Sequence, residues 1–144
     1  IRRPPRSTHG VSSAASDVYK RQVETLVTEL QTMIDDSQNP LADRHERELV
    51  AMDEQENAFG ARGSGRRDLL ERQRREIRRL RDDELRFGLA TLSRRYRDSV
   101  ANGGGDSGLD ATARLTATTG ELIRNPNERL LLQALFLDLH RVGG

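Results

Sequence analysis

Residues 125–140 read NPNERLLLQALFLDLH and combine a helix start signal with the most apolar run of the chain. Asn125 suits the N-cap position, Pro126 the first helical position, and Glu128 the position that closes a capping box. The apolar residues that follow lie on nearly every side of a helix running to about His140. Because a helix that is apolar all round must be buried in a core or covered by another chain, this stretch predicts the centre of a helical bundle.

Two rows of apolar residues can be drawn along that helix, because residues three or four apart share a face. One row holds Leu131, Leu135 and Leu139, and the other holds Leu132 and Phe136. The sequence does not indicate which row faces inward, so all five residues are candidates for contact with a neighbouring chain. Aspartate at an inward position should unfold the domain, whereas at an outward position it should prevent assembly only.

The composition indicates an all-α protein. The chain has 144 residues, no cysteine, 3% aromatic residues and 33% charged residues. A disulfide framework, a thiolate metal site and a cysteine nucleophile are therefore excluded, and charged helices are favoured over β-sandwiches or barrels. No apolar run approaches the roughly 20 residues that span a bilayer. We expect about five helices in a compact bundle.

Apolar periodicity and turn residues place the other helices. Gly60 lies where a left-handed C-terminal cap belongs, and the glycine-rich residues 101–108 connect two helices. The expected helices are residues 23 to about 37, Leu41–Phe59, Arg66–Val100 and Leu109–Arg124.

The expected long helix, residues 66–100, has two halves. In the first half, acids precede arginines by three or four residues, which predicts ion pairs on a solvated surface. These pairs are Glu71 with Arg74 and Arg75, Glu76 with Arg79, and Asp82 with Arg86. The second half should pack on a core through a stripe of Leu85, Leu89, Leu92, Tyr96 and Val100, widened by Phe87 and Ala90.

Residues 1–22 differ from the rest, since they contain two of the four prolines, the one lysine and no helical period. A basic, serine-rich start is typical of an organelle-targeting peptide. However, residues 17–22, DVYKRQ, resemble the translation of GAT GTG TAT AAG AGA CAG, a transposon-end sequence of sequencing-library adapters. We expect residues 1–22 to be an artefactual or disordered leader whose removal leaves the thermal midpoint unchanged.

The remaining residues 23–144 carry 19 arginines and 22 acids, a net charge of −3. Residues 23–60 hold 2 basic and 10 acidic residues, and residues 61–100 hold 13 and 7. An acidic helix pair therefore precedes a basic helix. The arginines between residues 66 and 86 could contact phosphates, but acids are interspersed and no aromatic residue lies among them before Phe87.

No catalytic or metal-binding constellation is found. His45 and Glu48 have the spacing of one part of a carboxylate-bridged metal site, but such sites need further ligands from other helices, so His45 should be solvated or half-buried. His140 suits a helix C-terminus, where a cation complements the dipole. The glycines at 60–65 follow no strand and precede no lysine, so a phosphate loop is not indicated. We expect no cofactor, no metal and no ATP binding.

Several segments together resemble the C-terminal domain of the delta-prime subunit of the bacterial DNA polymerase III clamp loader, in its actinobacterial form. The resemblance spans essentially all of residues 23–144. The segments are Asp68–Gln73 (DLLERQ), Arg81–Leu85 (RDDEL), Tyr96–Val100 (YRDSV) and Leu122–Leu135 (LIRNPNERLLLQAL).

The resemblance implies a helical collar domain that assembles with other clamp-loader subunits into a hetero-oligomeric ring in the bacterial cytoplasm. That complex loads the sliding clamp onto primed DNA during replication, and delta-prime serves it as a non-catalytic scaffold. In the family, an N-terminal nucleotide-binding-type domain precedes this domain, and we expect that domain to be missing here. Any zinc-binding cysteines or arginine finger that the family carries there would be missing with it. The alternative is a helical adaptor or regulator that contacts nucleic acid through the basic long helix.

Overall fold

The computed structural model describes residues 9–60, 63, 65–124 and 127–143, and within them every regular element is helical. This confirms the predicted all-α fold. The elements in chain order are α1 (His9–Ser37), α2 (Asn39–Phe59), α3 (Arg66–Ala101), α4 (Ser107–Glu121), the short 3-10 helix η1 (Leu122–Arg124) and α5 (Glu128–Gly143).

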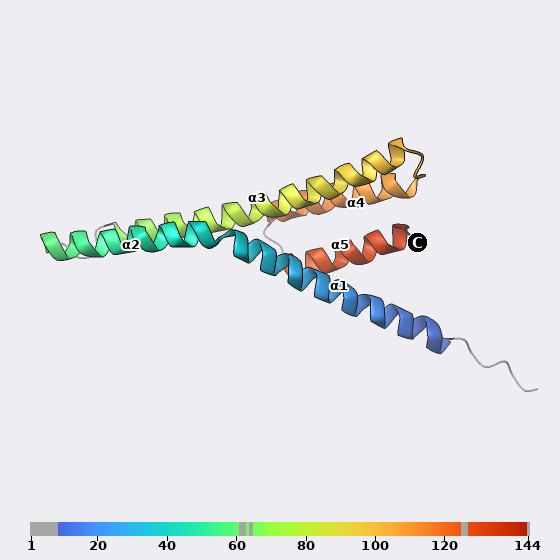
Figure 1. The fold of residues 1–144 in the computed structure, drawn as a ribbon, viewed down its shortest axis with the longest axis horizontal. Helices are drawn as coiled ribbons and strands as arrows, with labels where there is room; N and C mark the ends of the chain where they lie inside the picture. The colour runs from blue at the N-terminus through green and yellow to red at the C-terminus, as the bar shows by residue number, and fades with distance from the viewer. Residues whose placement is uncertain (1–8, 61–62, 64, 125–126, 144) are drawn as a thin grey trace, which may run out of the picture.

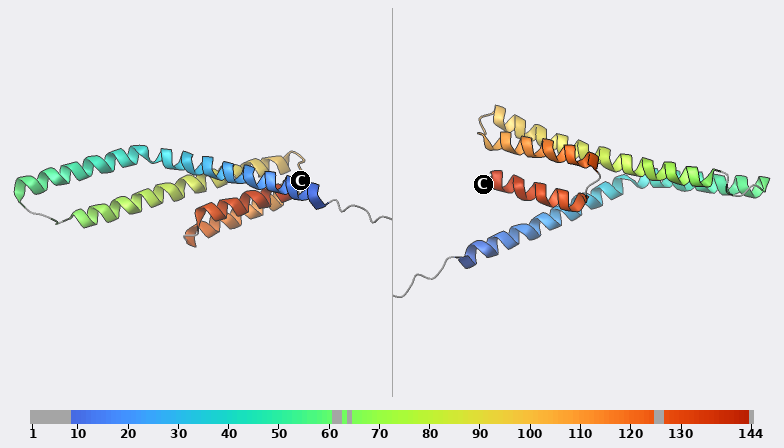
Figure 2. Two further views of the ribbon diagram at one scale, coloured as in Figure 1. Left: turned by 90° about the horizontal axis from the view of Figure 1, so that it is seen from below. Right: turned by 180° about the vertical axis from the view of Figure 1, so that it is seen from behind.

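The helices form a bundle and a projecting arm (Figures 1 and 2). In the bundle, α3 packs on α4, α4 on α5, α5 on α1, and α1 returns to α3. In the arm, α2 packs on the first half of α3, and these two segments extend away from α4 and α5 (Figure 1). The long helix α3 therefore belongs to both parts, and its two predicted halves correspond to the arm and the bundle.

The core lies within the bundle and contains residues from four helices and η1. The predicted stripe of α3 supplies Leu85 and Leu89, while Leu92 and Tyr96 pack at the core's edge. Phe87 and Ala90 are exceptions, because both side chains are exposed, Phe87 to 72%, and do not widen the buried stripe. The buried apolar residues are Val23, Val27, Ile34, Leu85, Leu89, Ala111, Leu115, Leu122, Leu132, Leu135 and Leu139.

The helix ends agree closely with the turn residues in the sequence. Gly60 has a left-handed φ of 66°, and its N–H bonds to the carbonyl of Glu56 at 3.0 Å, as expected for a C-terminal cap. One residue, Gln38, separates α1 from α2, and Pro40 lies in the first turn of α2, where a missing N–H costs nothing. Between α3 and α4, a side chain at Gly108 would overlap Val100, so glycine permits the close approach of these helices.

The N-terminal leader is a point of difference. Residues 9–22 are the first part of α1, so the prediction of a disordered leader is wrong for them, while residues 1–8 lie outside the described residues. Tyr19 donates a hydrogen bond to the carbonyl of Phe136 at 3.0 Å, and its ring stacks on His140 with centroids 3.6 Å apart. Tyr19 continues the apolar face of α1 and reaches α5. This contact was not predicted, because the apolar periodicity was followed only from Val23 onward. The adapter origin of the segment stays a prediction.

The core position of Leu132 gives the first testable prediction. Its side chain is fully buried, whereas Leu130 on the same helix is 62% exposed. Leu132→Ala should lower the free energy of unfolding by about 2–5 kcal/mol, because it leaves a cavity, and Leu130→Ala should change it by less than about 0.5 kcal/mol. Urea unfolding followed by circular dichroism measures both. Equal losses in the two variants would contradict this packing of α5.

Candidate assembly surface and interhelical junction

The five candidate interface residues of α5 do not share one environment. Leu132, Leu135 and Leu139 are buried in the chain's own core, so they are not available to a neighbouring chain. Leu131 and Phe136 are half-buried at its edge. Neither predicted row is the inward face, because spacings of three and four residues place Leu132, Leu135 and Leu139 together on one side of the helix.

The exposed apolar residues of α5 are different ones, Leu130 and Ala134, which we call the outer row. They are four residues apart and lie opposite the buried leucines. Leu130 is 62% exposed and Ala134 is exposed, whereas Leu137 is half-buried and packs against the core. Sequence reasoning did not single out this row, because a helix that is apolar on all sides gives no periodic signal for its outward face.

The predicted capping box at the start of α5 begins with Asn125 and Pro126, which lie outside the described residues. The side-chain oxygen of Asn127 accepts a hydrogen bond from the backbone N–H of Leu130 at 3.2 Å, and α5 begins at Glu128. Asn127 therefore performs the N-cap role. The carboxylate of Glu128 accepts hydrogen bonds from side chains of two other helices.

Those contacts form what we call the Arg81 junction, which consists of Arg81, Glu128, Asp35 and Gln31. The guanidinium of Arg81 on α3 donates two hydrogen bonds to Glu128 of α5, from Nε to Oε2 and from Nη2 to Oε1, each at 2.6 Å. Its Nη1 also donates to Asp35 of α1. Gln31 of α1 donates to Glu128 at 3.0 Å. The bidentate pair joins α3 to α5, and the bonds of Asp35 and Gln31 add α1, an arrangement that arginine's planar fork favours.

The junction changes the acidity of both its charged partners. Hydrogen bonds from Arg81 lower the pKa of Glu128 below its usual value, and the bond from Gln31 adds to this against the opposing effect of partial burial. The bonds to Glu128, and then to Asp35, raise the pKa of Arg81. Both groups are therefore held in their charged forms across the physiological range.

In the arm, polar side chains fill much of the contact between α2 and α3. His45 is buried rather than solvated or half-buried, with its Nε2 3.0 Å from Oε2 of Glu76. Buried Gln73 donates to the carbonyl of His45 at 3.0 Å and to Glu48 at 3.1 Å. Arg72 also bonds to Glu48, at 2.9 Å. Polar contacts of this kind fix the register of paired helices at some cost in stability.

The predicted ion pairs along α3 are wrong, and for Glu76 the contacts with α2 supply the reason. Among the residues that the structure describes, the pairs within α3 place arginine ahead of the acid, and none of the predicted pairs forms. His45 and Arg44 of α2 bond to Glu76 instead, and the bond from His45 chiefly lowers the pKa of that carboxyl. The observed pairs within α3 are Arg67 with Glu71, Arg72 with Glu76, Arg79 with Asp83, and Arg94 with Asp98, at 3.6–4.0 Å.

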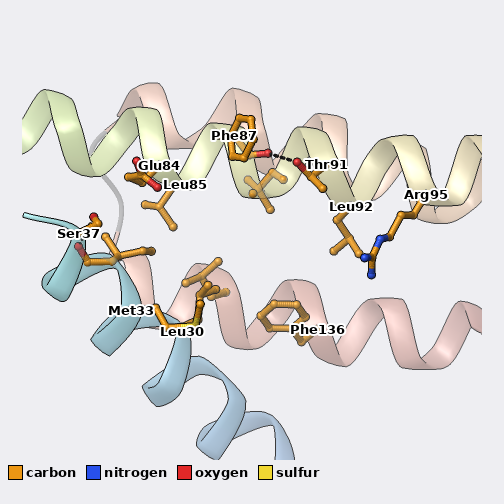
Figure 3. A pocket seen from close by; sticks show the side chains of 14 residues that line it. Leu30, Met33, Ser37, Glu84, Leu85, Phe87, Thr91, Leu92, Arg95 and Phe136 are labelled. Atoms are coloured by element: carbon orange, nitrogen blue, oxygen red, sulfur yellow. Dashed lines mark hydrogen bonds between the residues drawn. The ribbon is translucent and has the colours of Figure 1, made fainter.

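An apolar groove opens between α1, α3 and α5. Its volume is about 730 Å³, and Figure 3 shows its lining side chains. Met33 on α1 and Phe87 on α3 stand at its edges and are 69% and 72% exposed. Phe136 of α5 lines the floor. Of the candidate interface residues, Leu132 and Phe136 therefore also border this groove.

Within the described ranges, no three His, Asp or Glu side chains are grouped as metal ligands would be, and no helix combines the length and hydropathy needed to cross a bilayer. No protein-family model, curated protein or solved structure matches this chain.

The lowered pKa of Glu128 gives a pH-dependent prediction. A carboxyl whose pKa is lower in the folded state stabilises that state above its unfolded pKa, about 4.3, and loses this contribution as the pH falls through the folded value. Glu128→Gln should therefore cost about 1–2 kcal/mol at pH 7 and much less at pH 3. Urea unfolding at both pH values tests this.

The matched control is Glu121→Gln, because Glu121 is exposed at the end of α4. This variant should be as stable as the parent at both pH values. A Glu128→Gln variant that loses nothing at pH 7, or loses the same amount at pH 3, would contradict the assigned role of the carboxylate.

Proposed function

We propose that this chain is an assembly domain of the bacterial DNA polymerase III clamp loader, corresponding to the helical collar domain of the delta-prime subunit. The observation that carries the proposal is the resemblance at Tyr96–Val100 and Leu122–Leu135, which lie on α3 and across η1 into α5. The fold class supports it, because a collar domain is also helical. On this proposal the domain acts in DNA replication in the bacterial cytoplasm.

The proposed role is structural rather than enzymatic. The partners are the other clamp-loader subunits, which join this domain in a hetero-oligomeric ring, and DNA is engaged only through the whole complex. The outer row of α5 is the surface that we assign to a neighbouring subunit. Its apolar Leu130 and Ala134 are exposed next to each other on one face of α5, and a neighbouring subunit would cover both. No cofactor or metal belongs to the proposed role.

The alternative, a nucleic-acid adaptor, is favoured by one feature of the arm. Arg67, Arg74 and Arg78 are spaced by seven and four residues on α3 and so share a face. Arg74 and Arg78 line a hollow beside Arg81, and neither forms an ion pair with another described residue. Phosphate contacts by these arginines would release counterions, so the adaptor would bind DNA with a steep salt dependence.

Leu130→Asp tests the proposal, with the other clamp-loader subunits co-expressed. Leu130 lies in the first turn of α5, where an acid suits the helix dipole, so circular dichroism should show a folded domain. Co-purification should fall strongly, because a charge would be buried in the subunit contact. Val50→Asp, at a half-exposed position of α2, is the control and should co-purify like the parent.

Two outcomes would contradict the proposal. One is a parent chain that does not co-purify with any clamp-loader subunit. The other is a folded Leu130→Asp variant that co-purifies as well as the parent. If the parent instead binds DNA by itself, and the affinity falls steeply with salt, the adaptor is the better account.

A further inference from the structure

One face of α3 is covered by another helix in the arm but is exposed in the bundle. Up to Leu80, this face packs on α2 in the arm. At Gln38 the chain turns from α1 into α2, and α1 runs away from α3 toward α5 (Figures 1 and 2). The same face of α3 then borders the open groove. We call its residues there the α3 stripe: Glu84, Phe87, Gly88, Thr91 and Arg95, all of which line the groove.

The centre of the α3 stripe is suited to close contact with another helix. A side chain added at Gly88 would meet nothing within 4 Å, although glycine is, after proline, the least favourable residue in a helix interior. Thr91 donates its hydroxyl to the carbonyl of Phe87 at 2.9 Å, so its methyl group is free to pack against an apolar surface. Phe87 stands beside this centre and is 72% exposed. These residues leave an apolar surface with room for a second backbone.

The ends of the α3 stripe carry opposite charges. Glu84 and Arg95 are exposed and 11 positions apart, or about 16 Å along a helix. Neither forms an ion pair in the part of the chain that the structure describes, although many neighbouring arginines and acids do. Both side chains belong to the groove lining (Figure 3).

This charge order is self-complementary. If a second α3 lies antiparallel across the first, with the two-fold axis passing midway between Glu84 and Arg95, each Glu84 faces an Arg95 of the other copy. In the same register Gly88 faces Thr91, so the smallest residues meet at the crossing. A two-fold contact requires this reciprocity, in which one residue meets a second and the second meets the first.

We propose that two copies of this chain form a symmetric dimer through the α3 stripe, with the groove of each copy receiving α3 of the other. Two Glu84–Arg95 pairs set the antiparallel register, and Phe87 and Met33 lose their exposure to water. The proposal is independent of the clamp-loader assignment, because the outer row that we assign to neighbouring subunits lies on α5.

Charge reversal in the full chain tests the proposal, with sedimentation equilibrium as the measurement. The parent should dimerise with a dissociation constant in the micromolar range. Glu84→Arg alone, or Arg95→Glu alone, should raise that constant at least about tenfold, because each places like charges together twice in the dimer. The double variant Glu84→Arg with Arg95→Glu should recover affinity to within about threefold of the parent, since each pair is re-formed in reverse.

Arg86→Glu is the matched control, because Arg86 is exposed on α3, points away from the stripe and carries the same charge change as Arg95→Glu. It should dimerise like the parent. All the substituted positions are exposed, so circular dichroism should show unchanged helix content.

Three results would overturn the proposal. They are a parent that stays monomeric throughout the micromolar range, single reversals that leave dimerisation intact, and a double reversal that fails to restore it. If the monomeric parent instead binds a clamp-loader subunit, and Arg95→Glu weakens that complex, a helix of a different protein occupies the groove.

Discussion

The bidentate pair between Arg81 and Glu128 is the interaction on which the arrangement of the helices depends. Arg81 lies where α3 leaves the arm and enters the bundle, and its guanidinium also bonds to Asp35 of α1. Glu128 is the first residue of α5 and receives a further bond from Gln31. Three helices are therefore fixed relative to one another at one point. Both charges are partly withdrawn from water, where such pairs are stronger than at an open surface.

The position of this junction separates the two kinds of packing in the molecule. On its arm side, α2 and α3 meet largely through polar groups such as His45 and Gln73, and on its bundle side the leucines of α3 and α5 belong to the apolar core. The junction holds α1 against α5, and α1 diverges from α3. The groove and the uncovered α3 stripe lie between these diverging helices. The exposed groove is thus a consequence of the helix arrangement that the Arg81 junction stabilises.

Local features of the sequence predicted much of the fold. Gly60 and Pro40 mark helix ends by backbone geometry alone, and the stripe containing Leu85 and Leu89 indicates the buried side of α3. The features that could not be predicted depend on distant partners. No local pattern indicates that Glu128 pairs with a residue 47 positions away, and the apolar residues around α5 conceal its inward face. For the candidate assembly surface, the sequence therefore indicated the correct helix, α5, but not the residues that α5 exposes.

A double-mutant cycle on Arg81 and Glu128 tests most directly whether the junction determines the fold. The parent, Arg81→Ala, Glu128→Ala and the double variant are unfolded in urea at pH 7, and the coupling energy is the departure from additivity. The two side chains make two short, partly buried hydrogen bonds, so the coupling should be about 1–3 kcal/mol. A coupling below about 0.3 kcal/mol, the level seen for independent sites, would show that the helices are held in place without this pair.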